Sequence, residues 1–158
     1  MLYRKQFTRG RHGEIKLRLR TEERDLLEML CAELRQRIDE DPADDELRRL
    51  FPPAHADDPE ADAEYRRMVG NQLVGGRNRA LDTVERTIAQ SSLSPEEAES
   101  WLTALNDLRL VLGTRLDVTE EMSFDLRTGD PRAPELAVYG YLSWLQEQLV
   151  EALALGFR

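Results

Sequence analysis

The chain has 158 residues, of which 41% are hydrophobic and 34% are charged, and its formal net charge is −9. This balance favours one globular domain over residues 1–158 and argues against a disordered chain. No apolar run approaches the roughly 20 residues of a membrane span, and the first residues lack the apolar core of a signal peptide. We therefore expect a cytoplasmic protein.

Residues 1–20 are expected to form a β-hairpin. Apolar and basic side chains alternate over residues 15–20, which is the pattern of a half-buried strand, and the apolar set is Ile15, Leu17 and Leu19. Two glycines within residues 9–13 suit a turn. A lone hairpin is marginal in water, so its apolar face is expected to lie on the helices.

The hairpin is also where positive charge gathers. Residues 1–20 carry seven basic side chains and one acid, Glu14, so this segment is +6 and the remaining residues are −15. Such a segment suits an acidic protein partner or the phosphates of nucleic acid, although the acidic remainder argues against a broad nucleic-acid footprint. A solvated face, or one neutralised by the protein's own acids, is the alternative. The candidate partner-binding residues, called the basic hairpin surface below, are Arg4, Arg9, Arg11, Lys16, Arg18 and Arg20.

Residues 21–158 predict a bundle of about four or five helices, so the fold class is mainly α with an N-terminal β-hairpin. Apolar periodicity predicts long helices, and a short helical turn is expected over 45–50. Gly75-Gly76 interrupts one apolar stripe, and we expect a kink there or two helices meeting. The long helices are predicted over 22–40, 59–89, 95–116 and 135–154.

The helix over 95–116 is apolar around most of its circumference, which predicts a central and buried position. Polar groups on such a helix need partners, because an unpaired buried group costs roughly 1–3 kcal/mol. We expect a buried hydrogen-bonded network, with a polar pocket or a partner-binding spot as the alternative. Its members are predicted to be Asn106, Asp107, Arg109 and Arg115.

Motifs for catalysis and metal binding are missing from the sequence. His12 and His55 have no second histidine or cysteine at ligand spacing, and the acidic cluster at 39–46 lacks the mid-loop glycine of a calcium loop. There is no nucleophile elbow, phosphate-binding loop or dinucleotide fingerprint. Cys31, the single cysteine, lies among leucines and is expected in the core. We expect no enzyme, no metal and no cofactor.

Three stretches, taken in order and spacing, resemble a known family. They are Phe-Pro-Pro-Ala-His at 51–55 with Glu-Tyr-Arg-Arg at 64–67, the block at 101–116 that contains Asn-Asp-Leu-Arg-Leu-Val-Leu-Gly-Thr-Arg, and Tyr-Leu-Ser-Trp-Leu-Gln-Glu at 141–147. The family is the actinobacterial AosR, or actinomycete oxidative-stress regulator, family, formerly a domain of unknown function and often encoded beside the ClpS protease adaptor. The resemblance implies a transcriptional regulator that contacts an alternative sigma factor. A redox-sensing thiol pair needs two cysteines, and this chain has one.

The leading hypothesis is a non-enzymatic interaction protein that modulates transcription in the oxidative-stress response, with the basic hairpin surface as its contact. One alternative is a DNA-binding protein that uses the hairpin as a two-stranded ribbon. Another is a structural or adaptor protein linked to ClpS-type proteolysis. An enzyme would need a deep polar pocket around Asp107 and Arg109. A homodimer is a further alternative for the assembly of this chain.

Overall fold

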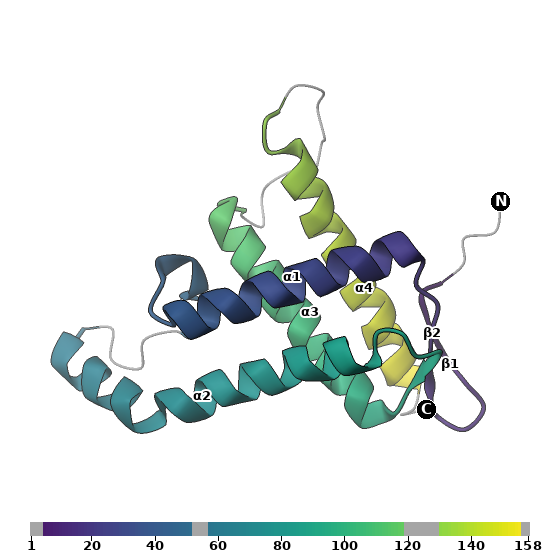
Figure 1. The fold of residues 1–158 in the computed structure, drawn as a ribbon, viewed down its shortest axis with the longest axis horizontal. Helices are drawn as coiled ribbons and strands as arrows, with labels where there is room; N and C mark the ends of the chain where they lie inside the picture. The colour runs from purple at the N-terminus through teal and green to yellow at the C-terminus, as the bar shows by residue number, and fades with distance from the viewer. Residues whose placement is uncertain (1–4, 52–56, 119–129, 156–158) are drawn as a thin grey trace.

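The computed structural model describes residues 5–51, 57–118 and 130–155. Figure 1 shows a mainly helical protein in which the N-terminal strands lie beside one end of the helices, and this confirms the predicted fold class. The described elements are β1 (Phe7–Arg9), β2 (Ile15–Leu17), α1 (Thr21–Glu40), the 3-10 helix η1 (Asp45–Leu47), α2 (Pro59–Thr87), β3 (Ser92–Leu93), α3 (Pro95–Arg115) and α4 (Ala133–Ala154).

The helix α3 is central, as its apolar circumference predicts. It contacts α1, α2, α4 and η1. Its start is fixed by a capping box, in which the Ser94 hydroxyl accepts from the Glu97 N–H at 3.1 Å and the Glu97 carboxylate accepts from the Ser94 N–H at 2.9 Å. Near its end, a Cβ on Gly113 would lie 2.9 Å from the Tyr139 ring, so glycine allows α4 to approach closely.

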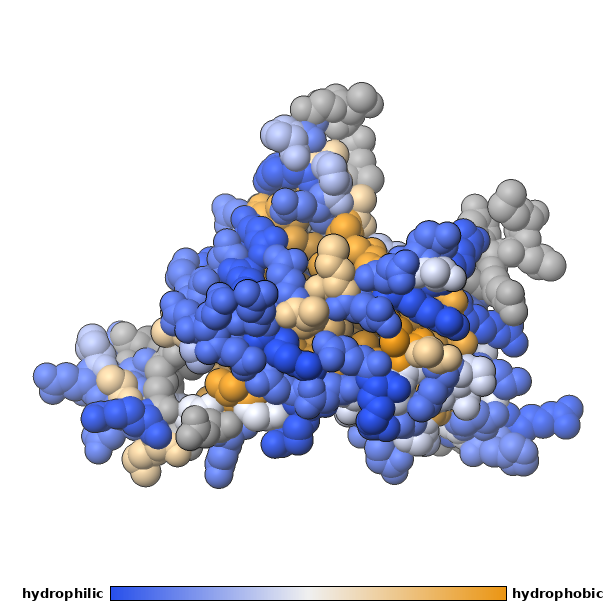
Figure 2. All heavy atoms as spheres, in the orientation of Figure 1, coloured by the Kyte–Doolittle hydropathy of each residue, from blue (hydrophilic) through white to orange (hydrophobic). Residues whose placement is uncertain are grey.

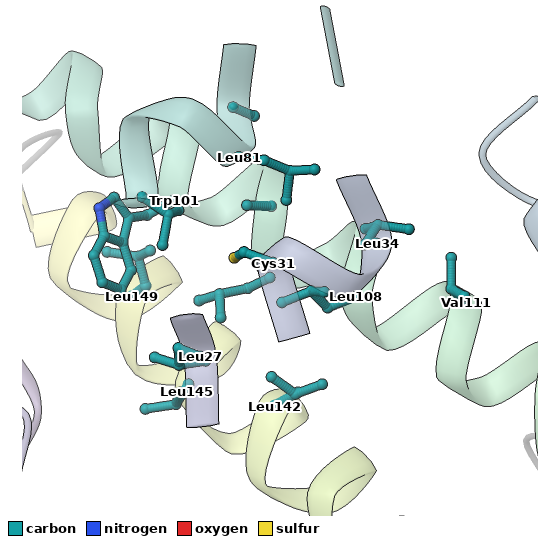
Figure 3. Close-up of a cluster of buried hydrophobic side chains, with 14 of the residues drawn as sticks. Leu27, Cys31, Leu34, Leu81, Trp101, Leu108, Val111, Leu142, Leu145 and Leu149 are labelled. Carbon is teal, nitrogen blue, oxygen red and sulfur yellow. The ribbon is translucent and has the colours of Figure 1, made fainter. Parts of the chain in front are cut away.

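The core lies where α1, α3 and α4 meet the second half of α2. Figure 3 shows Cys31 of α1 pointing in among side chains of the other three helices. The indole N–H of Trp101 donates to the Thr87 hydroxyl at 2.7 Å, and this hydroxyl donates to the Thr83 carbonyl at 2.6 Å. Both buried polar side chains are therefore satisfied. Phe7 of β1 stands edge-on to Trp101 at 5.9 Å between ring centroids, which ties the hairpin to this core.

The hairpin belongs to a three-stranded antiparallel sheet in the order β1-β2-β3. Phe7 pairs with Leu17 on one side, and Ile15 pairs with Leu93 on the other. The sequence did not predict β3, because a strand of two residues has no measurable periodicity. Because β3 pairs with β2, β2 is the central strand of the sheet and one edge of the hairpin is covered.

The helix α2 is one element from Pro59 to Thr87, so the expectation that two helices meet at Gly75-Gly76 is wrong. Two glycines cost a helix about 1 kcal/mol each. Two separate helices would instead leave four N–H and four C=O groups without intrahelical partners at the new ends. Leaving these groups unpaired costs more than the two glycines do, so the helix continues through them.

Candidate interaction surface

Strand β2 and the residues after it separate apolar from basic side chains as predicted. Ile15, Leu17 and Leu19 are buried against the helices. The alternating positions Lys16, Arg18 and Arg20 are exposed. Successive side chains of an extended chain point to opposite sides, so packing the three apolar residues forces the three cations outward.

The turn of the hairpin is built by backbone hydrogen bonds. The Gly10 N–H donates to the Glu14 carbonyl at 2.8 Å, and Gly13 adopts φ +86°, a conformation that favours glycine. The Glu14 carboxylate accepts from the His12 N–H at 3.0 Å. Backbone hydrogen bonds, first that of Glu14 itself and then that of His12, lower the pKa of this carboxyl. The one acid of the hairpin is thus engaged by backbone.

The cations of the hairpin lie close together without carboxylate partners. Among the residues that the structure describes, Arg9, Arg11, Lys16, Arg18 and Arg20 form no ion pair within 4.0 Å. Arg9 is half-buried and the other four are exposed. By contrast, the arginines of the helical body with a carboxylate partner are Arg35, Arg37, Arg48, Arg77, Arg86, Arg115 and Arg132. Arg4, the sixth predicted member, lies outside the described residues.

An aromatic pair that the sequence did not single out lies beside the hairpin. The Tyr141 hydroxyl donates to the Glu23 carboxylate at 2.8 Å, and the other oxygen of Glu23 accepts from the Arg20 N–H at 2.8 Å. The ring centroids of Tyr141 and Trp144 are 6.1 Å apart, and Trp144 is 42% exposed. A signal was available in the sequence, because Trp144 lies off the stripe of Leu142, Leu145 and Leu149 and helical spacing therefore places it on the outer face of α4.

The polar residues of α3 do not form one buried network, so that prediction is corrected. Asp107 is buried and pairs with Arg77 of α2 at 2.8 Å. Asn106 and Arg109 are half-buried and bond to each other at 3.0 Å. Arg115 is exposed and faces Glu46 at 3.4 Å. Asn106 and Arg109, three residues apart, share a face of the helix. Asp107 is one or two positions from them and Arg115 is six positions beyond Arg109, so these two side chains point elsewhere.

Asp107 is the member with unusual electrostatics. Its side chain is 1% exposed, and its Oδ2 has no hydrogen-bond partner among the described residues. Burial raises the pKa of Asp107 to about 6, and the charge of Arg77 only partly opposes this effect. The pair joins α2 to α3 and lies on different elements from the hairpin.

Comparison with known proteins shows which family this chain belongs to. The family model described as a domain of unknown function, DUF2017, matches residues 4–153. The chain belongs to the DUF2017 family. No solved structure matches it.

Curated relatives of this DUF2017 protein carry a functional name. It is 33% identical over 129 residues to a Mycobacterium tuberculosis protein named oxidative stress regulator AosR, and 32% identical over the same length to a Mycobacterium leprae protein named putative oxidative stress regulator AosR. Each alignment covers 71% of this chain and 59% of the relative, so the chain spans less than two thirds of the curated relatives' length. The resemblance to the AosR family is confirmed.

Cys31 of this DUF2017 protein is a core residue, as predicted. It is fully buried, and burial raises the pKa of its thiol to about 12. A thiol in this state is almost entirely protonated at neutral pH. Reactivity toward oxidants requires a thiolate and access, and the folded protein offers neither at this position.

Other possible sites have simpler explanations. Within residues 5–51, 57–118 and 130–155, no three histidine, cysteine or acidic side chains gather in a way that suits a metal ion, and His55 lies outside these ranges. Glu46 and Asp44 of the acidic cluster bind Arg37. A hollow of about 40 Å³ between α1, α3 and α4 has mainly apolar walls. No described helix has the length and apolar character needed to cross a membrane.

Proposed function

We propose that this protein is a non-enzymatic regulator that binds an acidic surface of a partner protein through the basic hairpin surface, with Trp144 as an apolar contact beside it. The observation that carries the proposal is the contrast in ion pairing. Five hairpin cations lie close together without a carboxylate among the described residues, whereas seven arginines of the body are ion-paired. The described arginines of the body that form no ion pair with a described residue are scattered over several elements and are Arg24, Arg49, Arg67, Arg79 and Arg109. Unpaired, outward cations attract an acidic partner and set its orientation.

The aromatic pair supports the same surface. Binding energy at protein interfaces concentrates in a few residues, and tryptophan, tyrosine and arginine are enriched among them. Trp144 is half-exposed, and the neighbouring Tyr141 is held in place by its own hydrogen bond to Glu23. An acidic segment with an apolar side chain would match both the cations and the indole.

The regulatory context comes from the relatives, which are named oxidative stress regulators. We take the partner to be part of the transcription machinery, with an alternative sigma factor as the expectation from the family resemblance. The position of β3 supports a protein partner over DNA. A free two-stranded ribbon fits the major groove, and here β3 covers one edge of β2.

A binding measurement with purified components tests this proposal. The protein is immobilised and exposed to RNA polymerase and to an alternative sigma factor from the same organism. Changing Lys16, Arg18 and Arg20 to Glu should weaken binding by more than about tenfold, because attraction becomes repulsion. The matched control changes Arg48, Arg86 and Arg132 to Glu, which alters net charge equally and should stay within about twofold. Equal binding by both triple variants would contradict the proposal.

Trp144→Ala separates the apolar contribution from the charge contribution. We expect binding about tenfold weaker, with the salt dependence of the wild type retained, since no charge is removed. The same preparations are then mixed with a labelled DNA duplex at low salt. Tight binding that falls steeply with added salt, without binding to the proteins, would replace the proposal with direct DNA recognition.

A further inference from the structure

The first half of α2 stands clear of the core. Among the described side chains of residues 59–79 none is buried, and the first buried one in α2 is Ala80. Figure 1 shows these turns extending past the end of α1. Most helical stability in proteins comes from packing of an apolar face, and glycine lowers helix stability. This half contains Gly70, Gly75 and Gly76, so it lacks support from both sources.

One face of this half has an ordered sequence of side chains. Helix positions three, four or seven residues apart share a face, and this spacing links Glu60, Glu64, Met68, Gly75 and Arg79. Exposed Arg67, three residues after Glu64, lies at the edge of this face, so two acids and one cation come first along the helix, Met68 lies in the middle and Arg79 comes last. Met68 is 77% exposed, the most exposed of the large hydrophobic residues that the structure describes.

The charges on this face complement those of a second copy in the opposite direction. Glu60 and Glu64 are exposed, and Arg79 is exposed and forms no ion pair with any described residue. At a rise of 1.5 Å per residue, the two acids lie about 15 and about 9 Å before position 70, and Arg79 lies about 14 Å after it. A two-fold axis near position 70 therefore brings the acids of each copy to Arg79 of the other.

We propose that α2 pairs antiparallel with α2 of a second copy of this chain. With the axis near position 70, Met68 of each copy lies opposite position 72 of the other, so the two methionines pack beside each other across the axis. Antiparallel pairing also opposes the two helix dipoles. A parallel pair would place acids against acids, so the charge order selects the antiparallel one.

The geometry also sets the strength and the consequence of pairing. A single helix pair about 30 Å long is at the small end of specific interfaces, so the dimer should dissociate in the micromolar range. Figure 1 places the hairpin at the opposite end of the molecule from the start of α2. Pairing therefore leaves both basic hairpin surfaces exposed, and the dimer is independent of the proposed function.

Sedimentation velocity from about 1 to about 200 µM tests the dimer, over the range where such an interface should associate. The wild type should shift from monomer to dimer as concentration rises. Met68→Glu should weaken association at least about tenfold, because it places a carboxylate at the centre of the contact. Val150→Glu is the matched control, because Val150 is an exposed apolar residue on α4, and it should associate as the wild type does.

A charge exchange tests the direction of pairing. Arg79→Glu alone should weaken association, and adding Glu60→Arg and Glu64→Arg in the same chain should restore it, since the complementarity is then rebuilt with signs reversed. Circular dichroism confirms folding of each variant, and Arg79 is exposed, so its change leaves the core intact. A wild type that is monomeric at about 200 µM, association unchanged by Met68→Glu, or a triple variant that stays as weak as Arg79→Glu would each overturn the proposal.

Discussion

The buried carboxylate of Asp107 makes the stability of this fold depend on pH. Burial raises its folded pKa to about 6 from an ordinary value of 3.8. The folded state therefore holds the proton more tightly than the unfolded chain, and the free energy of unfolding falls as pH rises through the interval between these two values. A shift of about two pKa units corresponds to about 3 kcal/mol.

Asp107→Asn keeps the shape and removes the charge. We expect the variant to match the wild type below about pH 4 and to exceed its unfolding free energy by up to about 3 kcal/mol at pH 8. Urea unfolding between these pH values measures the difference. Glu99→Gln, which changes an exposed acid on the same helix, should show no such trend. A less stable Asn variant at pH 8 would mean that the attraction to Arg77 exceeds the cost of burial.

The thiol of Cys31 should not react with alkylating reagents in the folded protein. Its thiol is fully buried and its pKa is about 12, so iodoacetamide at pH 8 should label it only when the protein unfolds. Labelling followed by mass spectrometry, with and without guanidinium, measures the contrast. Met29→Cys places a thiol at an exposed position of α1 and should react quickly. Rapid labelling of Cys31 in the native state would make direct oxidant sensing by this thiol feasible.

At the scale of elements, the two halves of α2 should differ in local stability. Leu81 and Val84 are buried, whereas no described side chain of residues 59–79 is. Backbone amides of residues 70–77 should exchange with solvent faster than those of residues 81–87, because opening them disrupts few contacts. Hydrogen exchange is measured at low concentration, where a second copy is not bound.

Gly70→Ala sharpens the exchange experiment. No atom lies within 4 Å of a Cβ at this position, so alanine fits and adds helix propensity of about 1 kcal/mol. Exchange in residues 70–77 should slow about fivefold, with little change in residues 81–87. Uniform protection along the whole of α2 in the wild type would contradict the uneven support inferred from burial.

The same elements show what the sequence predicts and what it does not. Alternation at Ile15, Leu17 and Leu19 fixed the orientation of the strand, because only one face could be buried. Partners far apart in sequence were inaccessible, as for Asp107, whose cation Arg77 is 30 residues away on α2. Apolar periodicity also does not show whether an apolar stripe of a helix packs against other elements. Leu73 and Val84, eleven residues apart, lie on one stripe of α2, yet the first is exposed and the second is buried.

At the scale of the whole molecule, the basic hairpin lies beside an acidic body, and among the described residues its cations form no ion pair with the acids of that body. The hairpin is held at its base by the last helix. The Gln6 N–H donates to the Gln148 side-chain carbonyl at 2.9 Å across 142 positions, and the Gln148 amide donates back to the Gln6 side chain at 3.4 Å. The orientation of the hairpin is therefore supported by this contact with α4 as well as by the burial of its apolar face.

Gln148→Leu should reveal this dependence. Gln148 is largely buried, and its loss leaves the Gln6 N–H without its acceptor, which should lower the unfolding free energy by about 1–3 kcal/mol. Hydrogen exchange in the strands of the hairpin should quicken, and partner binding should weaken although no charge has changed. Gln146→Leu, at a half-buried glutamine that bonds Asn106 at 3.3 Å, is the matched control and should leave the hairpin unaffected. Normal hairpin exchange and normal binding in Gln148→Leu would mean that Phe7 and Trp101 suffice to orient the cations, because their edge-on contact is untouched by the substitution.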